Sequence, residues 1–330
     1  MAGSVVFGST VQVSGVDGDV SVGVAAPPRY RVEQFPLAAQ GLSPEQARAQ
    51  PSKLLQPRYQ VVPFTGRDDT VAELAAWMRS QDHPFSVKLV SGAGGQGKTR
   101  LAGHVAAESA IAGWAIWRVS PTPTPQAASQ LDLPAERRVL VVVDYADRWP
   151  HSDLLGFLGD INGLSLRAGV AARVLLLARS AGGWWAALSE QVEAEPDAIA
   201  DDLDLTPLGD HTDSGELFRV AQQRFAAAMR VDGPFPPIPS FVKGPDYAQV
   251  LTVHMAALVS VDAHRHGDTV PTAPHLMSDY LLRRERVYWD QLHRNATDRV
   301  MTRPDVMGRA VYVATLTGAL PRADARTALD

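Results

Sequence analysis

The sequence contains no cysteine, which excludes disulfide bonds, thiolate nucleophiles and cysteine-based zinc sites. It is also poor in lysine: only four of its 31 basic residues are lysines, namely Lys53, Lys88, Lys98 and Lys243. A lysine at a special position therefore stands out, and Lys98 occupies one.

The chain lacks an excess of positive charge as well. The 31 basic residues face 36 acidic ones, for a net charge of −5, which argues against a protein that covers long stretches of nucleic acid. No apolar run approaches the roughly 18 residues of a membrane span, and the first residues lack the basic and apolar segments of a secretory signal. We therefore expect a soluble cytoplasmic protein, with neither a membrane nor nucleic acid as its partner.

What the sequence does contain is an alternation of apolar runs and amphipathic segments. Its 330 residues are 45% hydrophobic, enough for about two domains. The strands are expected to be continuous apolar runs, as in parallel sheets covered on both faces. The expected strands are 86–91, 114–119, 139–144 and 173–178, and the expected helices are 44–50, 68–79, 99–111, 153–168, 213–231, 246–266, 276–294 and 304–317. The fold class is therefore α/β: a parallel sheet flanked by helices, followed by an all-helical portion.

The first 60 residues carry weaker signals. Alternating valines between residues 11 and 24, broken at Asp17-Gly18, predict a small β-rich element over 1–26; a tail without structure is the alternative. Residues 27–60 are rich in proline and glutamine and are expected to be a linker. Within them, Ser43 and Gln46 form the pattern of a capping box at the start of a short helix.

The most specific motif is the segment 92–99, which fits G-x-x-x-x-G-K-[ST] between an expected strand and an expected helix. Glycines let consecutive N–H groups turn toward phosphate oxygens, and the helix start adds its positive dipole end. The lysine would reach the β- and γ-phosphates, and the threonine hydroxyl would bind Mg²⁺. The predicted cofactors are ATP or ADP with Mg²⁺, and the candidate nucleotide-binding residues here are Gly92, Gly94, Gly95, Gln96, Gly97, Lys98, Thr99 and Arg100.

A second element of phosphate chemistry follows. The apolar run 139–143 ends in Asp144, which makes Asp144 and Thr99 the candidate metal ligands. Tyr145 stands where many ATPases place the acid that polarises the attacking water, so Asp147 is the nearest substitute, with a role as a turn cap as the alternative. Arg179 follows the strand 173–178 at the same sheet edge and could neutralise the γ-phosphate. Asp144, Asp147 and Arg179 are thus the candidate catalytic residues.

Together these residues resemble the STAND class of P-loop NTPases, relatives of AAA+ proteins that include the NB-ARC and NACHT groups, and in particular large actinobacterial members. Phe64-Thr65-Gly66-Arg67 looks like the short motif that these proteins carry before the phosphate loop, and the resemblance implies that Arg67 contacts nucleotide. Leu205-Thr206-Pro207-Leu208 is similar to the segment that closes their core. The resemblance implies a nucleotide-binding core over 61–212, a helical lid over 213–300 and the start of a winged-helix domain over 301–330, within a longer protein.

The leading functional hypothesis is an ATP-binding, slowly hydrolysing switch whose nucleotide state controls lid closure and assembly. The resemblance implies self-association or a protein effector, in bacterial regulation or antiviral defence. The alternatives are a DNA-handling ATPase of the AAA+ type, a small-molecule kinase and an inert nucleotide-binding scaffold. ATP is preferred over GTP because no Asn-Lys-x-Asp motif is present.

Overall fold

The computed structural model describes residues 3–7, 29–122, 129–133, 138–195, 197–207, 213–294 and 302–317. Contacts within the chain divide it into two compact units. The first comprises Met1–Leu37, Arg67–Gly94 and Lys98–Thr206, and the second comprises Ala38–Gly66, Gly95–Gly97 and Pro207–Asp330. Each unit has its own cluster of buried apolar side chains, as expected of a separate domain.

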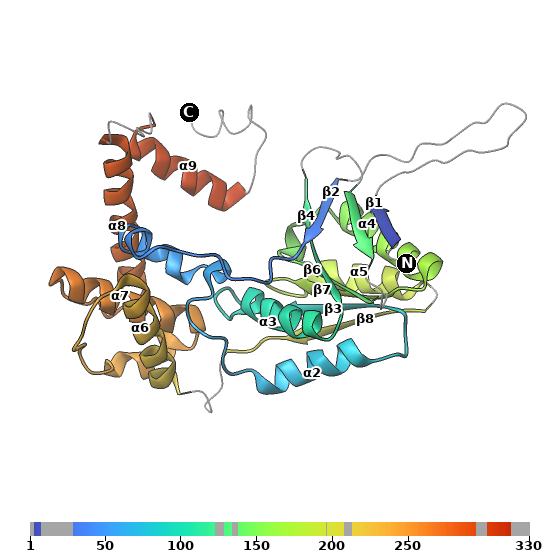
Figure 1. Cartoon of the computed structure of the whole chain (residues 1–330), viewed down its shortest axis with the longest axis horizontal. Coiled ribbons are helices and arrows are strands. Elements are labelled where there is room, and N and C mark those ends of the chain that lie inside the picture. Colours follow the sequence, from blue (N-terminus) through green and yellow to red (C-terminus); the bar gives the residue numbers. More distant parts are fainter. Residues whose placement is uncertain are drawn as a thin grey trace, which may run out of the picture. The chain divides into compact units, whose positions relative to one another are not determined.

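The first unit is built on a six-stranded sheet with the strand order β2-β4-β6-β7-β3-β8 (Figure 1). Four of its five neighbour pairs are parallel, and only β2 runs antiparallel to its neighbour β4. The sheet confirms the expected α/β class, with the correction that one edge is antiparallel. The strands are β2 (Tyr30–Gln34), β3 (Phe85–Ser91), β4 (Ala115–Pro121), β6 (Arg138–Val143), β7 (Ala171–Leu177) and β8 (Ala198–Asp204).

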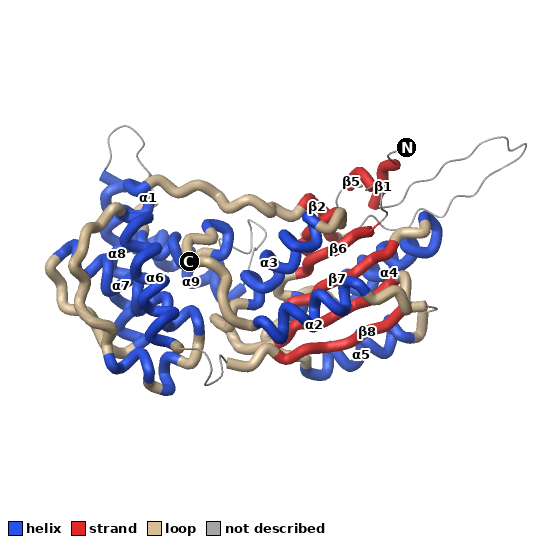
Figure 2. Tube along the Cα trace, turned by 60° about the horizontal axis from the view of Figure 1, so that its bottom comes forward, coloured by secondary structure: helices blue, strands red, loops and turns tan. Residues whose placement is uncertain are grey.

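Helices cover both faces of this sheet: α2 (Asp68–Arg79) and α3 (Lys98–Ile111) on one, α4 (His151–Ala168) and α5 (Gly182–Glu193) on the other (Figure 2). The side chains of β3 show the division. Phe85, Val87 and Leu89 join the cluster formed with α4 and α5, whereas Lys88 points to the opposite face and pairs with Glu73 of α2 at 3.0 Å. Because both faces are covered, every residue of β3 is buried, which explains the uninterrupted apolar runs in the sequence.

The sequence-based prediction lacked strand β8 and helix α5 of this unit. Strand β8 reads Ala-Ile-Ala-Asp-Asp-Leu-Asp, and its three aspartates hide the apolar pattern. They are tolerated because β8 lies at the edge of the sheet, where these side chains are exposed. Helix α5 precedes it and packs Trp185 and Leu188 into the core.

The N-terminal segments also differ from the expectation. Residues 30–34, assigned to a linker, form β2, because Tyr30 and Val32 alternate with exposed Arg31 and are buried against the sheet. Strand β1 (Gly3–Phe7) pairs antiparallel with β5 (Ser129–Leu133) in a separate two-stranded sheet. The expected strands over 11–24 and the turn at Asp17-Gly18 lie outside the described residues.

Among the described residues of the second unit, every regular element is a helix. The α-helices are α1 (Pro44–Ala49), α6 (Ser214–Met229), α7 (Val250–His266), α8 (Pro274–Arg294) and α9 (Pro304–Thr317). The predicted capping box at Ser43 and Gln46 is present with both hydrogen bonds. Helix α7 begins later than expected because a short 3₁₀ turn, Pro245–Tyr247, precedes it.

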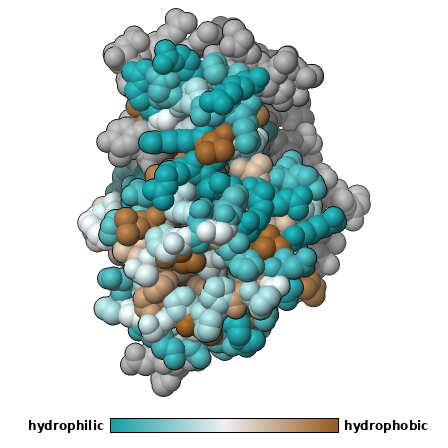
Figure 3. Space-filling view, turned by 90° about the vertical axis from the view of Figure 1, so that its left-hand side faces the viewer, coloured by the Kyte–Doolittle hydropathy of each residue, from teal (hydrophilic) through white to brown (hydrophobic). Residues whose placement is uncertain are grey.

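In Figure 3, hydrophilic residues cover most of the face in view and apolar residues form separate patches between them, which is ordinary for a protein surface.

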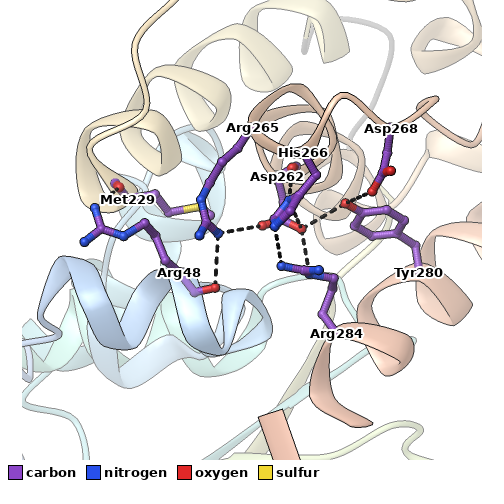
Figure 4. A network of polar contacts seen from close by, with 8 residues as sticks. All are labelled: Arg48, Met229, Asp262, Arg265, His266, Asp268, Tyr280 and Arg284. Atoms are coloured by element: carbon purple, nitrogen blue, oxygen red, sulfur yellow. Dashed lines mark hydrogen bonds and ion pairs between the residues drawn. The ribbon is translucent and has the colours of Figure 1, made fainter. Parts of the chain in front are cut away.

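A buried carboxylate joins the helices of this unit (Figure 4). Asp262 of α7 is fully buried, accepts a hydrogen bond from the Tyr280 hydroxyl (2.9 Å) and lies 3.1 Å from Arg284 Nε of α8. Arg265 lies 3.7 Å from the same carboxylate and also donates to the carbonyl oxygen of Arg48 in α1. This network fastens α1, α7 and α8 to one another.

Within the described part of the chain, no helix is long and apolar enough to cross a membrane.

Candidate functional site

The phosphate-loop motif lies between β3 and α3, and its glycines have the backbone geometry that the motif needs. Gly92, Gly95 and Gly97 have φ values of +149°, +82° and +90°, a region that favours glycine. A Cβ atom on Gly92 would lie 2.7 Å from the carbonyl oxygen of Leu205, whereas one on Gly94 or Gly97 would meet no atom within 4 Å. Close approach thus requires glycine at 92, while open space adjoins the loop at 94 and 97.

Lys98 is the first residue of α3, and its side chain folds back over the loop. Its Nζ donates to the carbonyl oxygens of Gly92 (2.5 Å) and Ala93 (3.0 Å). Burial lowers the pKa of Lys98, against the opposing influence of the carboxylates of Asp144 and Asp147. A partly desolvated ammonium on neutral carbonyl groups is well placed to exchange them for phosphate oxygens.

Thr99 and Asp144 come together from different elements. The Thr99 hydroxyl donates to Asp144 Oδ2 at 3.0 Å, and the backbone N–H of Tyr145 donates to Asp144 Oδ1 at 2.9 Å. Burial raises the pKa of the Asp144 carboxyl, although these hydrogen bonds oppose the rise. A hydroxyl and an oriented carboxylate within one hydrogen bond of each other are two oxygen ligands that one small cation could share.

Tyr145 turns away from this pair. It has φ +54°, is 51% exposed and carries the Arg148 guanidinium 4.9 Å above its ring. Its side chain is a phenol and lacks the carboxylate that many ATPases place after the metal-binding aspartate.

Asp147 does face the loop. It lies in the 3₁₀ turn Ala146–Arg148, its Oδ2 accepts a hydrogen bond from the Arg179 backbone N–H at 3.4 Å, and its charge acts on Lys98. Its Oδ1 is buried and has no hydrogen-bond partner among the described residues. The Arg179 charge acts on Lys98 too. The structure thus gathers Asp144, Asp147 and Arg179 around Lys98.

Three other candidate nucleotide-binding residues are Arg67, Gln96 and Arg100. Arg67, with φ +71°, precedes α2, and its Nη1 donates to the carbonyl oxygen of Thr206 at 2.6 Å. Burial lowers the pKa of both Arg67 and Arg100. Gln96 is 2% exposed. It belongs to the segment Gly95–Gly97, which clusters with the second unit.

Within that second unit, the loop segment is bonded to the start of α7. The Leu251 N–H donates to the carbonyl oxygen of Gly95 at 3.1 Å, and a Cβ atom on Gly95 would lie 3.1 Å from Leu251 Cβ. Gly95 of the phosphate loop and Leu251 in the first turn of α7, 156 residues later in the sequence, are therefore in direct contact.

Sequence reasoning missed one charged residue of this site. Asp204 ends β8, and its Oδ1 accepts a hydrogen bond from the hydroxyl of Ser91, its partner in the β3–β8 register, at 3.0 Å. Its charge also acts on Lys98. The missed strand hid this residue: without β8, nothing in the sequence places Asp204 beside the residue before Gly92.

The residues fit Mg²⁺ as a partner of phosphate rather than as a protein-caged ion. Among the described residues, no group of three or more His, Asp or Glu side chains could hold a metal ion. Mg²⁺ in nucleotide sites is bound by one or two protein groups together with phosphate oxygens and water. Thr99 and Asp144 supply such a pair.

No protein-family model and no curated protein matches this chain. Among solved structures, the Aeropyrum pernix ORC2 protein in its ADPNP-ADP complexes is similar, with a TM-score of 0.45 and 16% identity over 84% of this chain and 82% of that one. AMPPCP-bound DnaA from Aquifex aeolicus gives 0.37 and 12% over 84% and 88%, and C. elegans PCH-2 gives 0.38 and 11% over 69% and 70%. These likenesses are too distant to carry an argument, so the fold and the site rest on the geometry above.

Proposed function

We propose that this chain binds ATP or ADP with Mg²⁺ at the phosphate loop and acts as a nucleotide-controlled switch of the STAND type. The observation that carries the proposal is the Thr99–Asp144 hydrogen bond at the end of a glycine loop whose backbone bends as the motif requires. Lys98 and the N–H groups at the start of α3 would bind the phosphates. Thr99 and Asp144 would hold Mg²⁺, which supplies charge neutralisation to the phosphates.

Hydrolysis by this site is slow in our proposal. Tyr145 offers no base, so orienting a water molecule falls to Asp147, whose buried Oδ1 is free of hydrogen bonds within the described structure. Arg179 would compensate charge on the terminal phosphate, as an arginine does in related phosphoryl-transfer chemistry. Slow hydrolysis suits a switch that holds its state.

The Gly95–Leu251 hydrogen bond supports the switch reading over an inert scaffold. A phosphate that reorders the loop must act on the N–H of Leu251 and thus on the start of α7. A ligand shifts a conformational equilibrium only through different contacts in the two states, and this bond is one such contact. The assembly or effector that responds, in bacterial regulation or antiviral defence, rests on the STAND resemblance.

The DNA-handling alternative needs cations that face solvent. In the densest basic cluster, Arg283–Arg286, Arg284 lies against buried Asp262 and Arg283 lies 6.0 Å from the Tyr280 ring centre. Arg284 is thus engaged within the helical unit, whereas Arg283 and Arg286 are exposed. Salt-dependent retention of the protein on DNA at low ionic strength would favour the alternative, and our proposal predicts no retention.

The test is to denature the purified protein and identify the nucleotide that it releases. Lys98→Ala removes the phosphate-binding ammonium, and Lys243→Ala, at an exposed lysine, is the matched control. Stoichiometric ADP or ATP in the wild type and in the control, lost in Lys98→Ala, is the expected result. If the wild type releases no nucleotide and binds no added Mg-ATP, the proposal is wrong.

A further inference from the structure

A carboxylate outside the motif residues is built into the wall of the proposed phosphate site. Asp204 sits at the end of β8, directly opposite Ser91 in the parallel register. The Ser91 hydroxyl donates to Asp204 Oδ1 at 3.0 Å, and the Leu205 N–H donates to the Ser91 carbonyl oxygen at 2.7 Å. These two bonds fix the carboxylate against the last residue before the phosphate loop.

The packing of Gly92 on Leu205 links the segment that contains Asp204 to Lys98. Gly92, which follows Ser91, packs so closely on Leu205 that a Cβ atom would lie 2.7 Å from the Leu205 carbonyl oxygen. The carbonyl oxygen of Gly92 also accepts a hydrogen bond from the Lys98 ammonium. The segment from Asp204 to Leu205 and the segment from Ser91 to Gly92 thus form one side of the lysine's surroundings.

Carboxylates outnumber cations among the groups whose charges act on Lys98. Asp144, Asp147 and Asp204 are the carboxylates, and Arg179 is the cation. ATP without metal adds about four negative charges, and Mg²⁺ cancels about two of them, so repulsion acts more strongly on the metal-free nucleotide. Asp144 would bind the metal. The described contacts of Asp204 include neither Thr99 nor Asp144, so its charge would stay uncompensated by the metal.

We propose that Asp204 is a specificity-determining residue that makes the site discriminate between Mg²⁺-complexed and metal-free nucleotide. Its fixed negative charge beside Ser91, the residue before the loop, repels metal-free ATP and is tolerated when Mg²⁺ accompanies the phosphates. This inference rests on the proposed nucleotide binding. The inference gives the last residue of the edge strand β8 a role in nucleotide binding.

The experiment measures ATP affinity by titration calorimetry, once with excess Mg²⁺ and once with EDTA, for the wild type and Asp204→Asn. Asparagine keeps an oxygen for Ser91 and removes only the charge. The affinity with Mg²⁺ divided by the affinity in EDTA is expected to be about 3–10-fold smaller in Asp204→Asn than in the wild type, mainly because metal-free ATP binds the variant more tightly. The difference should shrink in high salt, because Asp204 is exposed to solvent.

Two further variants separate charge from structure. Asp202→Asn makes the same charge change on the same strand, at a residue that accepts a bond from Trp185 in α5, and should leave the ratio as in the wild type. Ser91→Ala removes the hydrogen bond and keeps the charge, so discrimination should persist.

Three results would overturn the inference: an unchanged ratio in Asp204→Asn, an equal fall in Asp202→Asn, or loss of discrimination in Ser91→Ala. If the wild type fails to bind Mg-ATP at all, the proposed function falls together with the inference. If the wild type binds Mg-ATP and the ratio is the same in Asp204→Asn, only the inference about Asp204 is wrong.

Discussion

Burial and hydrogen bonding at single residues set the chemistry of the phosphate loop. The Thr99 hydroxyl and the Asp144 carboxylate are held 3.0 Å apart by the start of α3 and the end of β6. The Tyr145 N–H fixes the other carboxylate oxygen, so Asp144 cannot rotate freely. Such an arrangement is preorganised for a cation and costs little reordering when one binds.

Replacing Thr99 with valine tests this pair, because valine keeps the shape and removes the hydroxyl. We expect Mg-ATP affinity to fall about 10–100-fold, as when a metal ligand or its support is lost, while ATP affinity in EDTA changes little. Titration calorimetry measures both. Thr70→Val in α2 is the control, and an equal loss with and without Mg²⁺ would show that Thr99 acts on the loop rather than on the metal.

At the scale of elements, polar side chains fasten the helices and strands to one another. Lys88 is buried in the central part of β3, where its side chain is 4% exposed, and pairs with Asp201 of β8 at 2.6 Å and Glu73 of α2 at 3.0 Å. Burial lowers the pKa of Lys88, but the hydrogen bonds and charges of Asp201 and Glu73 outweigh burial and leave the pKa raised. One ammonium thus ties a helix and an edge strand to the sheet.

This shift predicts a pH dependence of stability. A lysine whose pKa is raised on folding stabilises the protein fully below its unfolded value of about 10.4, and that stabilisation is lost as pH rises through the folded pKa. The free energy of unfolding should therefore fall more steeply between about pH 9 and 12 in the wild type than in Lys88→Met. Denaturant unfolding at each pH measures the slopes. Lys243→Met should keep the wild-type slope, and parallel curves for Lys88→Met would contradict the assignment.

The Asp262 network in the helical unit makes a second prediction at this scale. Arg284→Leu would leave a fully buried carboxylate without its nearest cation, and breaking such a pair typically costs about 3–5 kcal/mol. Arg283→Leu, one residue earlier on α8, is the matched control and should cost far less. Urea unfolding compares the two, and equal losses would mean that Asp262 does not depend on Arg284.

The same scale shows what the sequence could predict. Strands β6 and β7 contain the apolar runs 139–143 and 174–177, and β3 is apolar except for Ser86, Lys88 and Ser91. These strands and the loop that follows β3 were therefore predictable. Strand β8 was not, because three aspartates at a sheet edge look like a loop, and β2 was not, because only Tyr30 and Val32 of its five residues are buried. Asp204 was therefore missed as well. Asp147 and Arg179 were found because each follows a predicted strand closely.

At the scale of the whole molecule, the phosphate loop belongs to both compact units. Gly92 to Gly94 and the residues from Lys98 cluster with the sheet, whereas Gly95–Gly97 cluster with the helical unit. The Leu251 N–H bonded to Gly95 makes the start of α7 part of the loop's surroundings. In the proposed function, a nucleotide bound by the loop exerts its influence on the start of α7 through this hydrogen bond.

Hydrogen exchange can detect this influence. On saturation with Mg-ATP, we expect slower amide exchange at residues 92–101 and, in parallel, at 249–253, because ordering the loop strengthens the Gly95–Leu251 bond. The middle of α8 should exchange at an unchanged rate. Slowing confined to 92–101 would favour a nucleotide-binding scaffold over a switch.

A crystal structure grown with Mn²⁺ and a non-hydrolysable ATP analogue tests the central claim most directly. The account predicts an anomalous peak about 2.0–2.3 Å from Thr99 Oγ1 and beside the Asp144 carboxylate, with Lys98 Nζ moved from the carbonyl oxygens of Gly92 and Ala93 to the phosphates. A nucleotide bound elsewhere, or a loop that keeps Lys98 on those carbonyl groups while the analogue binds, would contradict it.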